Sequence, residues 1–269
     1  MSGVRTSPVR PPDQRPAWSE LAPMPVSRVS QRKPIIVGHR GAKGLAPENT
    51  LAAFQVAADL GIDGAEFDVQ RTKDGQLIVF HDEDVERVCG VAGFVPDMTL
   101  DEIKQLDAGS LFAPEFKGER IPTLAEAFAF LKQTDLLLFL ELKEPWRYPG
   151  IEAEVAALIR QYDLVERIQV RSFYHDGLYG IHAAAPEIPL SELWLDRLPA
   201  DDDITFNTVN ALFALLQPAD IARLHARGLN VTAWVVNELD EAQRLIEAGI
   251  DGLATDYPDQ LLTLFAPDA

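Results

Sequence analysis

The chain has 269 residues, of which 47% are hydrophobic and 25% are charged, so it is long enough for one large α/β domain or two small ones. Its formal net charge of -18 disfavours nucleic acids and anionic membrane surfaces as partners. Cys89 is the single cysteine, which excludes an internal disulfide and agrees with a reducing compartment. We therefore expect a cytoplasmic protein.

The first 34 residues differ in composition from the rest of the chain. They are rich in Pro, Arg and Ser, and their six basic and two acidic groups give a net charge of +4, whereas the other 18 basic and 40 acidic groups leave -22 on the remainder. They lack the apolar core of a secretory signal, and no run of about 18 apolar residues occurs in the sequence, so stable membrane insertion is not expected. Residues 1–34 are predicted to form a flexible leader, and residues 35–266 the folded domain.

From residue 33 onwards, short apolar runs alternate with segments of helical periodicity. The predicted strands are 35–38, 65–69, 77–80, 136–142, 168–172, 188–194, 230–236 and 252–255, with a possible extra strand at 204–207. The predicted helices are 50–60, 124–132, 151–162, 219–227 and 238–248. Repeated strand-then-helix order predicts an α/β fold, an irregular (β/α)8 TIM barrel, and no glycine-rich dinucleotide fingerprint supports an open sheet.

Two of these strands are too close in sequence for a crossover helix, and Asp74-Gly75 between them favours a two-residue hairpin loop. That loop would place Asp68 opposite His81, with Glu66 on the same face. We therefore expect these three ionisable side chains to converge. The opposite face of the hairpin would carry the apolar side chains Phe67, Val69, Ile78 and Phe80.

A long segment, residues 83–122, follows the hairpin. It is predicted to contain a short helix at 100–106, and its apolar content favours an ordered structure over a disordered loop. Because it begins beside His81 but contributes no histidine, we expect a small insertion at the barrel mouth that shapes substrate selection rather than chemistry.

Ionisable residues stand at the strand ends where barrels of this class carry catalytic groups. His39 and Arg40 end the first predicted strand, and Glu141 and Lys143, two residues apart and on one face, end another. Together with the hairpin, these residues would place two histidines, three carboxylates and two cations at one rim.

The residue types indicate different tasks at this rim. Glu66, Asp68 and Glu141 offer hard oxygen donors with no cysteine nearby, which suits Mg²⁺ or Ca²⁺. Arg40 and Lys143 can hold the oxygens of a phosphate. Two histidines beside a metal-bound phosphate suggest one proton acceptor and one proton donor, and both the assignment of these roles and the choice between water and a substrate hydroxyl as nucleophile stay open.

The sequence also resembles the glycerophosphodiester phosphodiesterase family from about residue 35 to 264. The resemblance is carried, in the order typical of the family, by GHRGAKGLAPENTLAAF, GAEFDVQRTKDGQLIVFHDEDVER, IPTLAEAF, LELKE, RSF, GLNVTAWVVN and GIDGLATDYPD. It implies a TIM barrel of the phosphodiesterase type that binds a divalent cation. It further implies hydrolysis of a small-molecule substrate, a glycerophosphodiester, to sn-glycerol 3-phosphate and an alcohol.

Carried over by motif, the resemblance implies that His39 and His81 form the catalytic pair and that the three carboxylates bind the cation. The residues implied to contact the phosphate or the rest of the substrate are Arg40, Lys143, Glu48, Asn49 and Trp234. Glu48 and Asn49 can instead orient the loop that precedes the first helix. Arg171 stands where the family usually has a small or apolar residue, and we favour an outward-facing salt-bridge partner over a third phosphate ligand.

Two other functions are compatible with the sequence. A phospholipase D-type hydrolase acting on lysophospholipids or sphingomyelin would need an apolar rim, which residues 90–95 and Leu111-Phe112 would supply. A non-catalytic barrel that binds phosphoesters would be expected to lack one of the histidines or carboxylates, and all of them are present.

Overall fold

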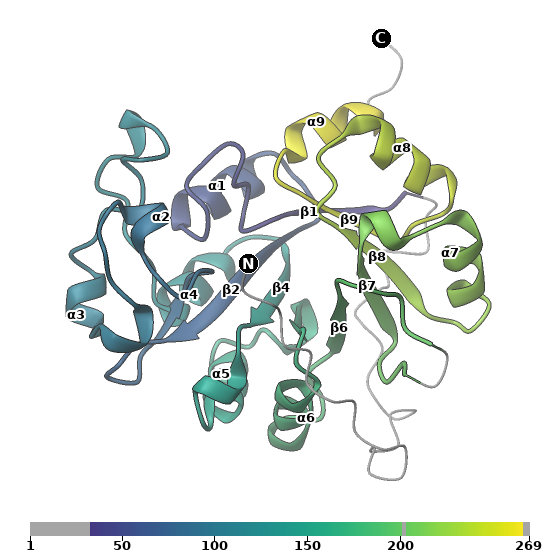
Figure 1. The fold of residues 1–269 in the computed structure, drawn as a ribbon. Helices are drawn as coiled ribbons and strands as arrows, with labels where there is room; N and C mark the ends of the chain where they lie inside the picture. The colour runs from purple at the N-terminus through teal and green to yellow at the C-terminus, as the bar shows by residue number, and fades with distance from the viewer. Residues whose placement is uncertain (1–32, 201–202, 266–269) are drawn as a thin grey trace.

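The computed structural model describes residues 33–200 and 203–265, and within them eight parallel strands form a closed barrel wrapped by helices (Figure 1). The strands follow the order β1-β9-β8-β7-β6-β5-β4-β2, and pairing of β1 with β2 closes the ring. The predicted α/β barrel is confirmed. Nearly all of the predicted leader lies outside the described residues, so its conformation stays a prediction.

The observed strands agree with the predicted ones to about two residues at each end, with one exception. The possible extra strand lies further along the chain than predicted, and it completes the barrel as β7. The parallel strands are β1 (Ile35–Gly38), β2 (Gly64–Arg71), β4 (Leu137–Leu142), β5 (Ile168–Ser172), β6 (Leu190–Trp194), β7 (Thr208–Leu212), β8 (Asn230–Trp234) and β9 (Gly252–Thr255).

The helices that cover the barrel are α1 (Leu51–Asp59), α4 (Leu124–Leu131), α5 (Ile151–Gln161), α6 (His175–Ala184), α7 (Pro218–His225), α8 (Leu239–Glu247) and α9 (Pro258–Leu262). Side chains fix some of their starts: the Thr50 hydroxyl accepts from the Ala53 backbone N–H at the start of α1, and Thr123 with Glu126 forms a capping box on α4. No helix separates β6 from β7 among the described residues, which makes the barrel irregular. In the described part of the chain, no helix has the length and apolar character needed to cross a membrane.

Alternation along the strands produces two apolar layers. On the outer face, Phe67 of β2 packs edge-to-face against Phe54 of α1 and Phe128 of α4, with ring centroids 5.5 and 6.3 Å apart. Inside the barrel, a smaller cluster is formed by Ile35, Val37, Phe139 and Ala254. The inner cluster fills the barrel interior below the carboxyl ends of the strands. The side chains at those ends therefore pack on a layer of apolar side chains.

The hairpin is present, but its predicted register is wrong by one residue. β3 (Leu77–Val79) pairs antiparallel with β2, with Val69 opposite Val79, and the Phe80 backbone N–H donates to the Asp68 carbonyl at 3.0 Å. Asp68 therefore lies opposite Phe80 rather than His81. The reason is a three-residue loop, residues 73–75, in which Gly75 takes a left-handed conformation with φ of 82°.

The shifted register moves the side chains of β3 to the other face. Ile78 and Phe80 do not share the face of Phe67 and Val69, contrary to the prediction. Instead they pack under the segment that follows, in an apolar cluster of their own with Val85, Val88, Val95, Ile103, Ala108 and Ile121. The hairpin therefore anchors residues 83–122 to the barrel.

This segment contains α2 (Glu86–Cys89), α3 (Leu100–Ile103) and the short 3-10 helices η4 (Val95–Asp97) and η5 (Pro114–Phe116). In Figure 1 it lies beyond α1 and α4, at the left of the barrel. Its outer tip, which we call the apolar tip, exposes Val91, Phe94, Leu111 and Phe112.

Candidate active site

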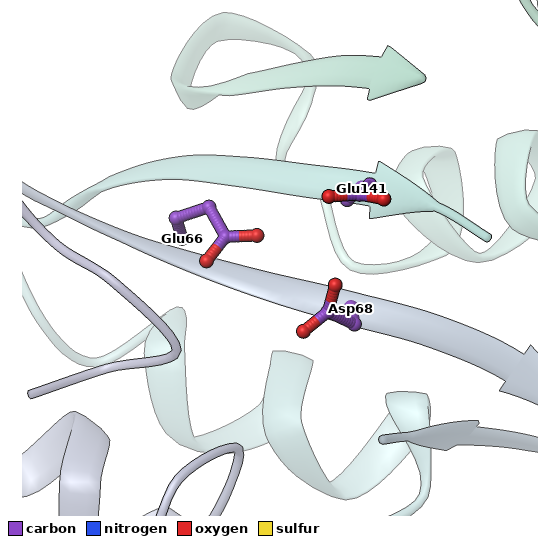
Figure 2. Close-up of side chains that lie close together, drawn as sticks. All are labelled: Glu66, Asp68 and Glu141. Atoms are coloured by element: carbon purple, nitrogen blue, oxygen red, sulfur yellow. The ribbon is translucent and has the colours of Figure 1, made fainter. Parts of the chain in front are cut away.

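Three carboxylates lie together on two adjacent strands, two of them within β2 and the third near the end of β4 (Figure 2). Glu66 and Asp68 are two residues apart on β2 and so share a face, and the register between the strands sets Glu141 of β4 beside Asp68. One oxygen from each side chain lies within 4.8 Å of the other two. All three side chains are buried, so the convergence predicted from strand-end spacing is seen in the structure.

The electrostatics of this cluster fit a divalent cation. Burial, together with the charges of Asp68 and Glu141, raises the pKa of Glu66 to about 8. Burial also acts to raise the pKa of Asp68, but the charges of His81, Lys143 and Arg40 lower it below its usual value. Asp68 Oδ1 is buried without a hydrogen-bond partner among the described residues. A buried carboxylate oxygen that lacks a hydrogen bond, among mutually repelling acids, is what a hard cation would satisfy.

Two basic side chains flank the acidic cluster. Lys143 Nζ lies 2.7 Å from Glu141 Oε1 and 3.7 Å from Asp68 Oδ1, and Arg40 Nε lies 3.6 Å from Asp68 Oδ2. The Arg40 backbone N–H also donates to Glu66 Oε2 at 2.9 Å, from a residue with φ of 51°. Arg40 and Lys143 therefore stand on two sides of the carboxylates, at the predicted rim.

His39 follows β1 and is oriented by Asp256, which follows β9. Its Nδ1 lies 2.6 Å from Asp256 Oδ1, while its Nε2 lies 3.9 Å from Glu66 Oε2. Burial lowers the pKa of His39, although the hydrogen bond to Asp256 opposes this. Asn237 Nδ2 donates to the second oxygen of Asp256 at 2.9 Å and so fixes the carboxylate.

The sequence reasoning missed Asp256. The signal was available, because Asp256 comes directly after a predicted strand, in the same strand-end position that singled out His39.

His81 follows β3 and is oriented by its neighbour Asp82. Its Nδ1 lies 2.6 Å from Asp82 Oδ1. The side-chain amide of Gln70 donates to the backbone carbonyls of Phe80, His81 and Asp82 at 3.1, 2.9 and 2.6 Å, which curls the chain after the hairpin. This curl brings His81 close enough to lower the pKa of Asp68, even though the hairpin register does not pair the two residues.

Glu48 and Asn49 form hydrogen bonds with other residues of the rim. Asn49 Nδ2 donates to Asp68 Oδ2 at 2.8 Å, and its Oδ1 accepts from the Asp68 backbone N–H at 3.2 Å. Glu48 Oε1 accepts from Arg40 Nη1 at 2.7 Å. These contacts favour the alternative in which the two residues orient the loop and its neighbours.

Two aromatic side chains that follow or end different strands, Phe173 after β5 and Trp234 on β8, meet at the barrel mouth. Trp234, at the end of β8, packs edge-to-face on Phe173, with ring centroids 5.4 Å apart. Its indole N–H donates to the Asn210 carbonyl at 3.3 Å, which fixes the ring across the mouth from the carboxylates.

Arg171 does not face outward, so the favoured interpretation of this residue is wrong. It pairs in register with Glu141, which turns its side chain to the interior, where it is 4% exposed. The guanidinium lies 4.4 Å from the centre of the Phe139 ring, and its Nη2 donates to Gln169 Oε1 at 3.3 Å. Burial lowers the pKa of Arg171 to about 10, against the opposing attraction of Glu66 and Glu141.

Comparison with known proteins gives one consistent result. Residues 39–260 match the model of the glycerophosphoryl diester phosphodiesterase family. The chain is 38% identical over 237 residues to a glycerophosphodiester phosphodiesterase of Caldanaerobacter subterraneus subsp. tengcongensis, covering 86% of this chain and 98% of the relative. It is 35% identical over 238 residues to a glycerophosphodiester phosphodiesterase of Bacillus altitudinis, covering 85% and 97%.

A solved structure agrees with these relatives. A phosphodiesterase from Oleispira antarctica, in complex with the product sn-glycerol-3-phosphate, has a TM-score of 0.76 and 30% sequence identity to this chain. The match covers 86% of this chain and 96% of that structure.

Proposed function

Because this chain belongs to the glycerophosphoryl diester phosphodiesterase family and is a hydrolase of that class, we propose that it cleaves glycerophosphodiesters to sn-glycerol 3-phosphate and an alcohol, with His39 and His81 transferring the protons. The observation that carries the proposal is the buried acidic cluster flanked by two histidines, each oriented by its own aspartate. The substrate is a small molecule, and the catalytic unit comprises residues 35–266, including the insertion.

Glu66, Asp68 and Glu141 would hold a divalent cation, Mg²⁺ or Ca²⁺. When bound, such a cation polarises a phosphoryl oxygen and offsets the repulsion between an anionic substrate and the acidic site. Lys143 and Asn49 support this role because they orient the carboxylates, Lys143 by a hydrogen bond to Glu141 and Asn49 by a hydrogen bond to Asp68.

Arg40 and Lys143 are proposed to bind the phosphate oxygens. Their cationic heads lie next to the carboxylates and on the same rim, so one phosphate placed at the acidic cluster is within reach of both. Trp234 is proposed to pack against the uncharged part of the substrate, because its ring stands across the mouth from the charged groups.

The two histidines are held in the same way. In each, Nδ1 contacts an aspartate oxygen, so we propose that Nε2 is the nitrogen that accepts or donates a proton. The His39 side chain is 14% exposed and that of His81 30% exposed. We assign proton acceptance to the more enclosed His39 and protonation of the departing alkoxide to His81, which lies nearer the solvent that receives the alcohol.

The direct test is turnover on a substrate panel. Release of sn-glycerol 3-phosphate is measured for glycerophosphocholine, glycerophosphoethanolamine and glycerophosphoinositol, and release of the headgroup alcohol, with an acylglycerol 3-phosphate as the other product, is measured for lysophospholipids. We expect cleavage of at least one glycerophosphodiester, dependent on added Mg²⁺ or Ca²⁺. If no member of the panel is cleaved with either cation present, the proposed function is wrong. Detection of a cyclic glycerol phosphate would identify the substrate hydroxyl, rather than water, as the nucleophile.

The same panel tests a second candidate function, hydrolysis of lysophospholipids. The apolar tip favours it, because its four large apolar side chains are exposed on the insertion that begins two residues after His81. Faster turnover of lysophosphatidylcholine than of glycerophosphocholine would support this candidate. The reverse order would leave glycerophosphodiesters as the substrate class.

A further inference from the structure

Arg87, on α2 of the insertion, bridges two carboxylates that come from different loops. Its Nε donates to Asp82 Oδ2 at 2.6 Å. Its two terminal nitrogens donate to the two oxygens of Glu48, Nη1 to Oε2 at 2.8 Å and Nη2 to Oε1 at 2.7 Å. The guanidinium therefore makes a two-pronged contact with one acid and a single contact with the other, a pattern that the single ammonium of lysine does not reproduce.

Each of these carboxylates holds, with another contact, a group of the proposed active site. Asp82 Oδ1 lies 2.6 Å from His81 Nδ1, and Glu48 Oε1 accepts from Arg40 Nη1 at 2.7 Å. A continuous chain of short contacts thus runs from His81 through Asp82, Arg87 and Glu48 to Arg40. His81 follows β3 and Arg40 follows β1, so the chain joins two separate strand ends.

The position of Arg87 is fixed by the core of the insertion. Its neighbours along the chain, Val85 and Val88, are both buried in the apolar cluster that also contains Ile78 and Phe80. The Arg87 side chain itself is half exposed, whereas that of its partner Glu48 is 12% exposed. Because solvent screens the Arg87 end of these ion pairs, we expect their main effect to be on the geometry of the groups at both ends of the chain.

We propose that Arg87 is a positioning residue that sets the separation of His81 and Arg40, so that the proton donor and the phosphate-binding guanidinium act on one phosphate. The proposal rests on the proposed function of the site. It also gives the insertion a part in the chemistry, whereas the sequence predicted for it only a part in substrate selection. Misplacement of a reacting group by about 1 Å lowers rates by about 100-fold, so the separation of the two groups is decisive.

The test compares Arg87→Ala with Arg147→Ala. Arg147 is a matched control, because it also bridges two acids near the rim, Glu83 and Glu144, at 2.7 and 2.6 Å, but within the described part of the chain neither acid forms a hydrogen bond or ion pair with His81 or Arg40. For Arg87→Ala we expect kcat on glycerophosphocholine to fall by about 10- to 100-fold with a smaller change in KM, and the melting temperature to stay close to that of the wild type. Arg147→Ala should retain kcat within about twofold.

Two further readouts separate positioning from a general structural role. Free guanidinium ion at a non-denaturing concentration should restore part of the kcat of Arg87→Ala, and NMR should show altered ring-nitrogen shifts of His81 in Arg87→Ala but not in Arg147→Ala. Arg87→Lys, which keeps the charge, should also be impaired, and it supplies the same comparison if the alanine variant does not fold. Wild-type kcat in both Arg87 variants, or an equal loss in Arg147→Ala, would overturn the proposal. An inactive wild-type enzyme would instead refute the proposed function.

Discussion

The two halves of the barrel differ in how their buried polar side chains are hydrogen-bonded. In the half formed by β9, β1, β2 and β4, which we call the acidic half, polar side chains at the strand ends are paired with one another. Examples are His39 with Asp256 and Lys143 with Glu141, at 2.6 and 2.7 Å. These pairs hold the candidate catalytic groups in place before any substrate arrives.

The half formed by β5 to β8 has a polar interior with few such pairs. Val209 and Ala211 of β7 and Val231 and Ala233 of β8 belong to the apolar cluster between the barrel and the helices. Because side chains alternate along a strand, the other side chains of β7 and β8 point into the barrel. Among the described residues, buried side-chain atoms in this half lack hydrogen-bond partners: Gln169 Nε2, Arg171 Nε, Thr208 Oγ1, Thr232 Oγ1 and both amide atoms of Asn210.

The comparison indicates in which half of the barrel the polar side chains are held more firmly. Side chains in the acidic half are fixed by charged hydrogen bonds, so the loss of one partner is expected to disturb several others. In the β5–β8 half, Thr208, Asn210 and Thr232 have buried polar atoms without hydrogen-bond partners among the described residues, so changes at these positions should stay local. Activity is therefore expected to depend steeply on the first half and weakly on these residues of the second.

The largest effect on cation binding and turnover is expected when one carboxylate is removed from the acidic half. Glu66→Gln keeps the shape of the side chain but removes one of the three charges, so affinity for a divalent cation and turnover should fall together, each by more than about 100-fold. Calorimetric titration with Mn²⁺ and turnover on glycerophosphocholine measure the two effects. Thr232→Val, inside the other half, should leave both nearly unchanged. Full turnover after exhaustive chelation would contradict the assignment.

The next largest effect should distinguish the two histidines. Loss of a general acid lowers rates by about 10²- to 10⁴-fold, and the loss shrinks when the leaving group needs no proton. His81→Ala should therefore be severely impaired on a diester of an alkyl alcohol and much less impaired on a p-nitrophenyl diester. His39→Ala should be impaired on both.

Steady-state kinetics of both variants on the two substrates provide the measurement. Equal impairment of His81→Ala on the two diesters would reject His81 as the acid. Near-normal activity in either variant would reject the two-histidine mechanism itself.

Local rules sufficed to predict the acidic cluster from the sequence. Residues two apart on a strand share a face, and parallel strands end at the same rim, which together placed Glu66, Asp68 and Glu141 correctly. The same rules could not supply the partners of the histidines. The contact between His39 and Asp256 spans 217 positions, and only the closure of the ring by β1 and β9 brings them together.

The errors in the fold have local physical causes. The hairpin register slipped because Asp74-Gly75 is compatible with both a two-residue and a three-residue loop. Helix α6 was not predicted because Gly177 and Gly180 weaken its helical pattern. Its packing explains Gly177, since a Cβ at that position would lie 2.5 Å from Pro145 Cγ. Neither the loop length nor this close approach can be deduced from periodicity.

A smaller effect is expected at the apolar tip, which extends the acidic half outward. Phe94 is exposed, and Asp84 at the start of the insertion pairs with it in an isolated antiparallel bridge. Phe94→Ser should change the ratio of kcat/KM between lysophosphatidylcholine and glycerophosphocholine by several-fold, because only the former has an acyl chain to pack on the tip. Trp146→Ser, at an exposed aromatic outside the insertion, is the control. An unchanged ratio in Phe94→Ser would identify the tip as a packing element.

The smallest effect tests the contrast between the halves directly, with the same substitution made on two adjacent strands. Thr232 on β8 and Thr255 on β9 are both buried. Thr255 Oγ1 donates to Asn237 Oδ1 at 3.2 Å and accepts from the Tyr257 backbone N–H at 3.1 Å, whereas Thr232 Oγ1 has no hydrogen-bond partner among the described residues.

Valine has nearly the shape of threonine but cannot form a hydrogen bond, so each substitution measures what the hydroxyl contributes. Thr255→Val should lower the free energy of unfolding by about 1–2 kcal/mol, because it leaves the Tyr257 N–H without its acceptor, and it should lower kcat as the amide that orients Asp256 loosens. Thr232→Val should leave the free energy of unfolding unchanged or raise it by about 1 kcal/mol, because an unpartnered buried hydroxyl is replaced by a methyl group. Urea unfolding of both variants gives the comparison. A loss in Thr232→Val equal to that in Thr255→Val would mean that ordered water satisfies the hydroxyl, and the β5–β8 half would then be as well ordered as the acidic half.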